Sequence, residues 1–325
     1  IHRVRRLLAF LEVHRDVVFF GVGHQRFTRT QIPLTPRCNY PHIRLQCVGA
    51  QFETHLVVTL AGGAVPRDGV VLTFDDGFRD HYDYVLPELE RRGLWGIFYV
   101  STGVYRDRQA LDVHRVHCLL GRLGGPAALA RLAKMITPDM LLPEHEEAFR
   151  GRTYLRTSND EATKEFKRTL NYHLRDRSRT AALNRMMAET FDEEALVERF
   201  YMSPDMIREM QGQGMIIGSH SVTHPVFSKL SPRRQVEEIV ESFAALDDMT
   251  GRLSPRTFCY PYGLRHTFTG ETERLLREAG CRFAFAVDSR DIEPTDIREH
   301  PQALPRYDCN EFPHGRITTH LENSS

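Results

Sequence analysis

Two runs of consecutive apolar residues with a helical segment between them constrain the fold more than any other feature of this chain. The first run is Val70–Phe74 and the second is Gly96–Val100. An unbroken apolar run of this length is typical of a strand buried on both faces, as strands of parallel sheets are. The intervening segment has Pro87 in its first helical turn and Gly93 where the helix would end. Strand, helix and strand in this order predict a parallel sheet covered by helices.

The same alternation returns after residue 200. Serine–proline pairs at 203–204 and 231–232 are typical helix starts, and a third helix is expected over 271–279. The buried face expected for the second helix consists of Val236, Ile239, Val240, Phe243 and Leu246. Further strands are expected at Met215–Gly218, Thr257–Tyr260 and Arg282–Val287. Repeated units of this kind form either an open doubly wound sheet or a (β/α) barrel.

The region from about residue 106 to 200 has a different pattern, because it is charged and poor in strand signals. Its apolar residues recur at helical spacing, as at Phe166, Leu170 and Leu174. We interpret it as a helical insertion in a single α/β domain that spans residues 1–325. The first 65 residues carry only weak patterns, with Val17–Phe20 as a short strand candidate.

The balanced charge excludes function classes that need a strong electrostatic field. The chain has 43 Lys and Arg against 43 Asp and Glu, and a pI near 7.4 with a mean hydropathy of −0.41. We therefore expect no nucleic-acid partner, and no run approaches the roughly 20 apolar residues of a transmembrane helix. The six cysteines form no C-x-x-C pair, which favours reduced thiols. We expect a cytoplasmic protein, while the start at Ile1 is also compatible with a signal peptide removed before it.

Three polar segments follow predicted strands, at the edge where parallel sheets place their active sites. They are Thr73–Gly77 with the sequence T-F-D-D-G, His220–His224 with H-S-V-T-H, and Tyr260–Gly263 with Y-P-Y-G. Adjacent carboxylates at Asp75 and Asp76 repel each other unless a cation lies between them.

A metal site would account for the first two segments together. Two histidines four residues apart and one carboxylate form the ligand set of a catalytic zinc site, and the second carboxylate is then left as a base. The alternative is that the aspartates cap the following helix and that His220 and His224 recur by chance among sixteen histidines. The position of both segments at strand ends favours the metal site.

The three segments resemble the signature of the polysaccharide deacetylase family, also known as the NodB homology domain or carbohydrate esterase family 4. T-F-D-D-G and H-S-V-T-H match its first two motifs, and Pro261–Gly263 matches the end of its third. The resemblance covers roughly residues 66–104 and 203–310. It implies a distorted (β/α) barrel that removes acetyl groups from sugars with Zn²⁺ or another divalent transition metal.

The resemblance also implies roles for individual residues. Asp75 would be the general base, and Asp76, His220 and His224 would be the metal ligands. The backbone N–H of Tyr262 would help to hold the tetrahedral oxyanion.

The chain departs from the family at two places. Cys259 stands where the third motif has an arginine that orients the catalytic aspartate, and the late leucine–histidine motif has no clear match. Because the last strand of a closed barrel lies beside the first, we predict that Arg306 replaces the missing arginine through a two-pronged contact with Asp75. His266 is the candidate general acid. A surface arginine and a loop histidine without a role are the alternatives.

These residues predict a metal-dependent hydrolase that deacetylates an N-acetylated sugar or surface glycan. Two other functions are compatible with the same motifs: a non-catalytic carbohydrate-binding relative, and an amidohydrolase acting on a non-sugar amide such as a cyclic imide. An insertion of roughly a hundred residues at the sheet's rim would narrow a cleft, which favours an N-acetylhexosamine of bacterial surface-glycan biosynthesis over mature peptidoglycan or chitin.

Overall fold

The computed structural model describes residues 71–143, 153 and 159–308. The chain divides into two compact units. The first consists of Ile1–Thr102 with Phe200–Ser325, and the second is Gly103–Arg199. The strand candidate Val17–Phe20 lies outside the described residues.

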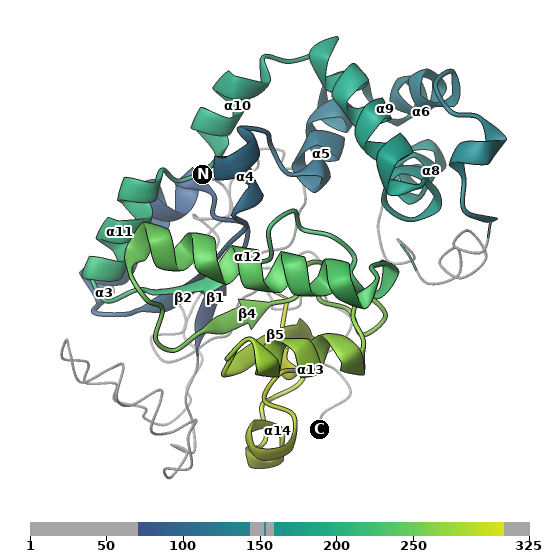
Figure 1. Cartoon of the computed structure of the whole chain (residues 1–325). Helices are drawn as coiled ribbons and strands as arrows, with labels where there is room; N and C mark the ends of the chain where they lie inside the picture. The colour runs from purple at the N-terminus through teal and green to yellow at the C-terminus, as the bar shows by residue number, and fades with distance from the viewer. Residues whose placement is uncertain (1–70, 144–152, 154–158, 309–325) are drawn as a thin grey trace, which may run out of the picture. The chain divides into compact units, whose positions relative to one another are not determined.

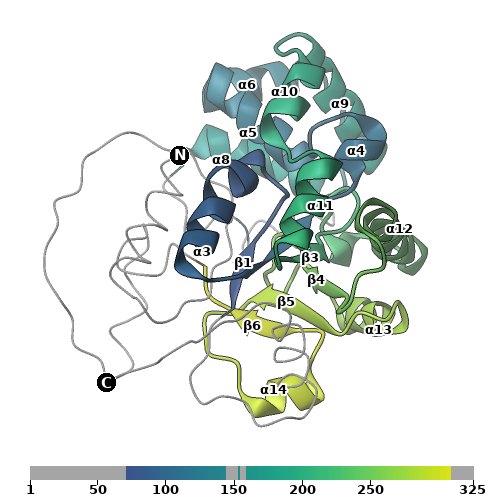
Figure 2. The ribbon, with the colours of Figure 1, turned by 90° about the vertical axis from the view of Figure 1, so that its left-hand side faces the viewer.

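The first unit is built on one parallel sheet of six strands (Figures 1 and 2). The strands are β1 (Leu72–Phe74), β2 (Gly96–Val100), β3 (Ile216–Ser219), β4 (Thr257–Cys259), β5 (Phe283–Val287) and β6 (Leu304–Arg306). Each strand pairs in parallel with the next one along the chain. A doubly wound sheet would reverse its strand order at a switch point, whereas a barrel keeps the strands in sequence.

The sheet is curled, so that its first and last strands approach each other through side chains. Nη1 of Arg306 on β6 donates a hydrogen bond to Oγ1 of Thr73 on β1 over 3.1 Å. Among the described residues the backbone pairing ends at β1 and β6, so the barrel is incomplete. The predicted distorted (β/α) barrel is confirmed.

The helices of the first unit begin and end largely where the sequence predicts. They are η2 (His81–Val85), α3 (Leu86–Arg92), α11 (Pro204–Gly212), η5 (Phe227–Lys229), α12 (Pro232–Thr250), α13 (Gly270–Glu278) and α14 (Pro294–Glu299). Gly93 ends α3 in the left-handed region with φ of 64°. The side chains of Ser203 and Ser231 cap α11 and α12 by accepting from Met206 N and Arg234 N.

The buried face of α12 differs from the predicted one. Val236 and Val240 are 39% and 49% exposed, whereas Ile239, Phe243 and Leu246 are buried as expected. The other buried residues of this face are polar: Gln235, Glu238 and Ser242. The prediction was wrong for Val236 and Val240, because the inward face is rotated toward polar partners: Glu238 accepts from Val222 N and Thr223 N after β3, and Ser242 lies beside Ser219 on β3.

The second unit consists of helices in the part that the structure describes. They are α4 (Gly103–Asp107), α5 (Asp112–Leu123), α6 (Gly125–Ala133), η3 (Pro138–Met140), α8 (Glu161–Arg168), η4 (Thr169–His173), α9 (Asp176–Ala188) and α10 (Glu193–Phe200), whose last residue already belongs to the first unit. Arg115 is 2% exposed in this unit, and its Nη2 donates to Oε2 of Glu193 over 2.7 Å. The predicted helical character of this region is confirmed, and its membership in a single domain with the rest of the chain stays a prediction.

No helix within the described ranges has both the length and the apolar character needed to cross a membrane.

Candidate metal and active site

The carboxyl ends of four strands bring four predicted site residues and Cys259 to one place in the first unit. Asp75 and Asp76 follow β1, His220 follows β3, Cys259 is the last residue of β4, and Arg306 is the last residue of β6. All five side chains are buried. Parallel strands end at one edge of their sheet, and for this reason residues distant in sequence meet there.

Asp76, His220 and His224 form a triangle of ligand atoms. Oδ1 of Asp76 lies 3.6 Å from Nε2 of His220 and 3.6 Å from Nε2 of His224. Bonds of about 2.0–2.2 Å to a tetrahedral zinc ion leave about 3.3–3.6 Å between neighbouring ligand atoms. The three side chains therefore have the spacing that a divalent metal requires.

The orientation of the His220 ring also fits a metal. Its Nδ1 lies 2.7 Å from the backbone carbonyl oxygen of Cys259. A carbonyl oxygen only accepts, so the neutral ring carries its proton on Nδ1 and directs the lone pair of Nε2 toward Asp76. Two lone-pair atoms that face each other in a buried site favour a cation between them. A backbone carbonyl that fixes the ring of a metal-ligating histidine is a common supporting contact.

Strained backbone is concentrated at this site. Left-handed φ angles occur at Asp76 (79°), Ser221 (66°), His224 (58°) and Tyr262 (63°), and among the described non-glycine residues only Arg108 shares this feature. Each such residue costs on the order of 1–3 kcal/mol and persists only where surrounding contacts enforce it. The concentration of strain supports a functional role for this edge of the sheet.

The predicted contact between Arg306 and Asp75 is present. Nη1 of Arg306 donates to Oδ1 of Asp75 over 2.9 Å, and Nη2 donates to Oδ2 over 2.5 Å. Burial alone would raise the pKa of Asp75, but the charge and hydrogen bonds of Arg306, together with the interaction with His220, outweigh burial, so that the pKa lies below its usual value. The pair keeps Asp75 ionised and fixes the orientation of its carboxylate.

Cys259 adds a contact to the same carboxylate that the sequence did not reveal. Its Sγ donates to Oδ2 of Asp75 over 3.6 Å. Burial raises the pKa of the Cys259 thiol well above its usual value, so the thiol stays protonated and is a donor rather than a nucleophile. Asp75, His220 and Cys259 also lie close enough for a metal, but Arg306 already occupies both oxygens of Asp75. The triangle at Asp76 is therefore the better metal site.

Two further side chains on α12 support the segment His220–His224. Glu238 accepts from the backbone N–H groups of Val222 and Thr223 over 2.9 and 2.8 Å, and Ser242 lies 2.6 Å from Ser219, Oγ to Oγ. Sequence reasoning missed both residues. The available signal was the presence of polar residues four apart on the first long helix after the H-S-V-T-H segment.

The structure does not bring the remaining two candidates into the same group of ligand atoms. The Tyr262 ring lies edge-on to the His224 ring at 4.9 Å between centroids, and its backbone role stays a prediction. His266 is half-buried, and its backbone carbonyl accepts from Oγ of Ser228 over 2.7 Å. Neither residue belongs to the clusters of metal-ligating atoms found among the described residues.

Comparison with known proteins links the chain to deacetylases. Residues 177–284 match the family model "Polysaccharide deacetylase". This range includes the H-S-V-T-H and P-Y-G motifs but not Asp75 and Asp76. The chitooligosaccharide deacetylase of Bradyrhizobium sp. (strain ANU 289) is 28% identical over 89 residues, which are 27% of this chain and 39% of that protein.

Several solved structures are similar at low identity. The deacetylase PplD of Streptococcus pyogenes, in complex with acetate, has a TM-score of 0.44 and 14% identity, and the match covers 80% of this chain and 72% of that one. IcaB from Ammonifex degensii has a TM-score of 0.42 and 18% identity, with 77% and 72% covered. The predicted resemblance is confirmed over residues 177–284, which are similar to the polysaccharide deacetylases and carry the second and third of the three motifs.

Proposed function

We propose that this chain is a metal-dependent hydrolase that removes the acetyl group from an N-acetylated sugar. The observation that carries the proposal is the shared position of two groups at one edge of the sheet. Asp76, His220 and His224 have the spacing of metal ligands, and the neighbouring Asp75 is held ionised by Arg306. A ligand triangle next to an oriented carboxylate is the arrangement that metal-assisted hydrolysis of an amide requires.

The roles follow from the chemistry of each group. Asp76, His220 and His224 would hold the ion. A bound divalent metal supplies Lewis-acid polarisation of the acetyl carbonyl and makes water more acidic. Asp75 would take the proton of the attacking water, since an ionised carboxylate keeps free lone pairs beside its bonds from Arg306. The backbone N–H of Tyr262 would donate to the developing oxyanion, and we propose His266 as the acid that protonates the departing nitrogen.

The Asp75–Arg306 pair favours a hydrolase over a non-catalytic carbohydrate-binding relative. A buried ion pair costs desolvation energy, and a binding protein gains nothing from a base that is kept ionised. We further propose that the substrate is an N-acetylhexosamine of a bacterial surface glycan, and that the ion is zinc.

Acetate release tests the proposal directly. The full chain would be incubated with nucleotide-sugars, lipid-linked sugars and chitooligomers, each with and without a chelator. We expect one substrate class to yield acetate, and we expect the chelator to abolish the yield.

Asp75→Asn should lower turnover by about 100-fold or more, the usual contribution of a positioned base. The matched control is Asp83→Asn, because Asp83 is a carboxylate on η2 that pairs with Arg79. This variant should leave turnover unchanged. Acetate release that survives both the chelator and Asp75→Asn would contradict the proposed mechanism.

A further inference from the structure

The segment that carries His220 and His224 is held from one side by a single helix. Backbone bonds fix its start: His220 N donates to Val100 O over 3.0 Å, and Thr102 N donates to Ser221 O over 3.1 Å. Beyond Ser221, side chains of α12 bind the backbone of the segment. Between His220 and His224, the two predicted metal ligands, the partners of the segment thus change from backbone groups to side chains.

The segment needs external support because its backbone is strained. Ser221 and His224 both have left-handed φ angles, of 66° and 58°. Neither residue is glycine, so each of these conformations costs on the order of 1–3 kcal/mol. The backbone at Val222 and Thr223, between the two strained residues, must therefore be anchored for Nε2 of His224 to stay near Asp76.

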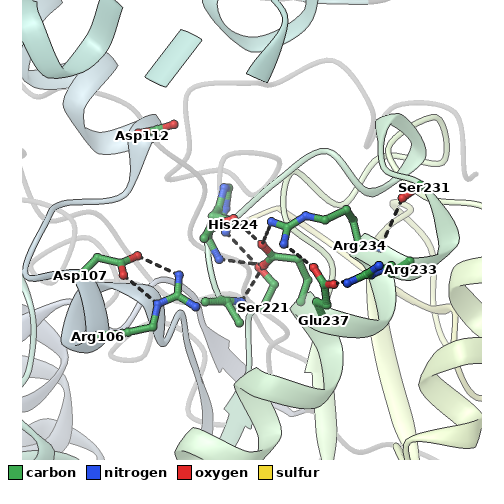
Figure 3. A network of polar contacts seen from close by, with 12 residues as sticks. Arg106, Asp107, Asp112, Ser221, His224, Ser231, Arg233, Arg234 and Glu237 are labelled. Carbon is green, nitrogen blue, oxygen red and sulfur yellow. Dashed lines mark hydrogen bonds and ion pairs between the residues drawn. The ribbon is translucent and has the colours of Figure 1, made fainter. Parts of the chain in front are cut away.

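One anchor is a relay of hydroxyl groups. Ser221 N donates to Oγ of Ser219 over 3.1 Å, and this Oγ lies 2.6 Å from Oγ of Ser242. Since Oγ of Ser242 donates to the carbonyl of Ile239 over 2.8 Å, the hydroxyl of Ser219 must donate to Ser242. Oγ of Ser221 in turn accepts from His224 N over 3.0 Å (Figure 3).

The second anchor is the carboxylate of Glu238, one helical turn before Ser242. Oε2 accepts from the N–H groups of Val222 and Thr223 over 2.9 and 2.8 Å, and Oε1 accepts from Oγ1 of Thr223 over 2.5 Å. Glu238 is 2% exposed. A buried carboxylate that receives three hydrogen bonds from two consecutive residues holds them more rigidly than water can.

We propose that Glu238 is a positioning residue that sets the affinity of the site for its metal by holding Val222 and Thr223. The proposal rests on the proposed function in one respect, because it takes His220 and His224 as metal ligands. The hydrogen bonds of Glu238 go to Val222 and Thr223, and its Oε1 lies 3.8 Å from Nη2 of Arg234, so it acts through the backbone between the two histidines. Removal of a supporting contact of this kind lowers metal affinity by about 10- to 100-fold in characterised sites.

Co²⁺ titration of the metal-free full chain, followed by visible absorption, tests the proposal. Glu238→Leu removes all three bonds and should weaken Co²⁺ binding by about 10- to 100-fold. Glu238→Gln should restore affinity close to that of the unmodified chain. Its carbonyl oxygen can accept from both N–H groups, and its amide can donate to Oγ1 of Thr223. Because glutamine is uncharged, restored affinity in Glu238→Gln would show that the hydrogen bonds of residue 238, and not its charge, support Co²⁺ binding.

The neighbouring Glu237 provides a matched control. It faces outward and pairs with Arg233 and Arg234 (Figure 3). Glu237→Leu should therefore leave Co²⁺ affinity unchanged. Should Glu238→Leu fail to fold, as judged by circular dichroism, Thr223→Val removes one bond only and should weaken binding in the same direction by a smaller factor.

The outcomes distinguish this proposal from the proposed function. Unchanged Co²⁺ affinity in Glu238→Leu, or equal losses in Glu238→Leu and Glu238→Gln, would overturn the role of Glu238 while leaving the metal site standing. An unmodified chain that binds no Co²⁺ would overturn the metal site itself and the role of Glu238 with it.

Discussion

At the scale of single residues, the main feature of the site is the residue that pairs with Asp75. Cys259 stands where the resemblance implies an arginine, and a cation reaches Asp75 from β6 through Arg306 instead. Arg306 is 3% exposed, and Asp75 supplies the negative charge that compensates its burial. The sequence could predict this contact because the last strand of a barrel returns to the first. It could not predict the thiol contact of Cys259, since side-chain directions within a strand depend on how strongly the sheet curls.

Arg306→Lys tests whether Asp75 needs hydrogen bonds from two nitrogen atoms of one side chain. Lysine keeps the positive charge but has a single donor group and cannot bind both oxygens of Asp75 at once. We expect kcat to fall by about 10- to 100-fold with little change in KM, because the orientation of the base is lost and the substrate contacts are kept. Steady-state acetate release measures both constants.

The matched control for this change is Arg265→Lys. Arg265 is exposed, and its Nη2 lies 3.3 Å from Oδ2 of Asp288. Exposed pairs of this kind contribute about 0–1 kcal/mol, so turnover should be unchanged. Unimpaired kcat in Arg306→Lys would mean that Asp75 needs no two-pronged partner.

At the scale of elements, helix ends were predictable and helix faces less so. Gly93, Ser203 and Ser231 mark real helix ends, because caps and left-handed terminators are local chemistry. Pro87 does not mark a helix start, because η2 continues directly into α3 and Val85 already has helical backbone. The inward face of α12 was wrong at Val236 and Val240. A periodicity argument counts apolar residues, whereas the folded helix turns Glu238 and Ser242 inward to meet the strained segment after β3.

The start of α14 gives a pH-dependent prediction. Asp296 accepts from Glu293 N and from both Nη1 and Nη2 of Arg290, and the bonds from Arg290 lower the pKa of Asp296 to about 2. A pKa below the unfolded value of roughly 3.9 stabilises the fold above that pH, and this stabilisation is lost as the pH falls toward 2. Because Arg290 is 42% exposed, solvent screening limits the effect to about 1 kcal/mol.

Asp296→Asn should accordingly lower the melting temperature at pH 7, and the difference from the unmodified chain should shrink as the pH falls from 4 toward 2. Thermal melts across this range measure it. Asp248→Asn, an exposed change on α12, should show no such trend. A difference that stays constant down to the lowest pH would argue against an ionised Asp296 as the source of the stabilisation.

At the scale of the whole molecule, the order of strands is the feature that assembles the site. Motifs at residues 75–76, 220–224 and 261–263 lie far apart in the sequence, yet sequential parallel pairing brings them to one edge. The sequence predicted this edge and the helical character of the region from about 106 to 200, because buried strands, motif positions and helical spacing are strong signals. It did not predict the contacts behind the ligands, at Glu238, Ser242 and Cys259, since these depend on three-dimensional packing.

The most direct test of the central claim is a calorimetric titration of the metal-free chain with Zn²⁺, repeated for Asp76→Asn and Asp75→Asn. The two aspartates are adjacent and both buried, so each variant is the control for the other. We predict one Zn²⁺ per unmodified chain, near-normal affinity in Asp75→Asn, and a loss of at least about 100-fold in Asp76→Asn because one of three protein ligands is removed. Full affinity in Asp76→Asn, or loss of binding in Asp75→Asn alone, would contradict the assignment of Asp76 as ligand and Asp75 as base.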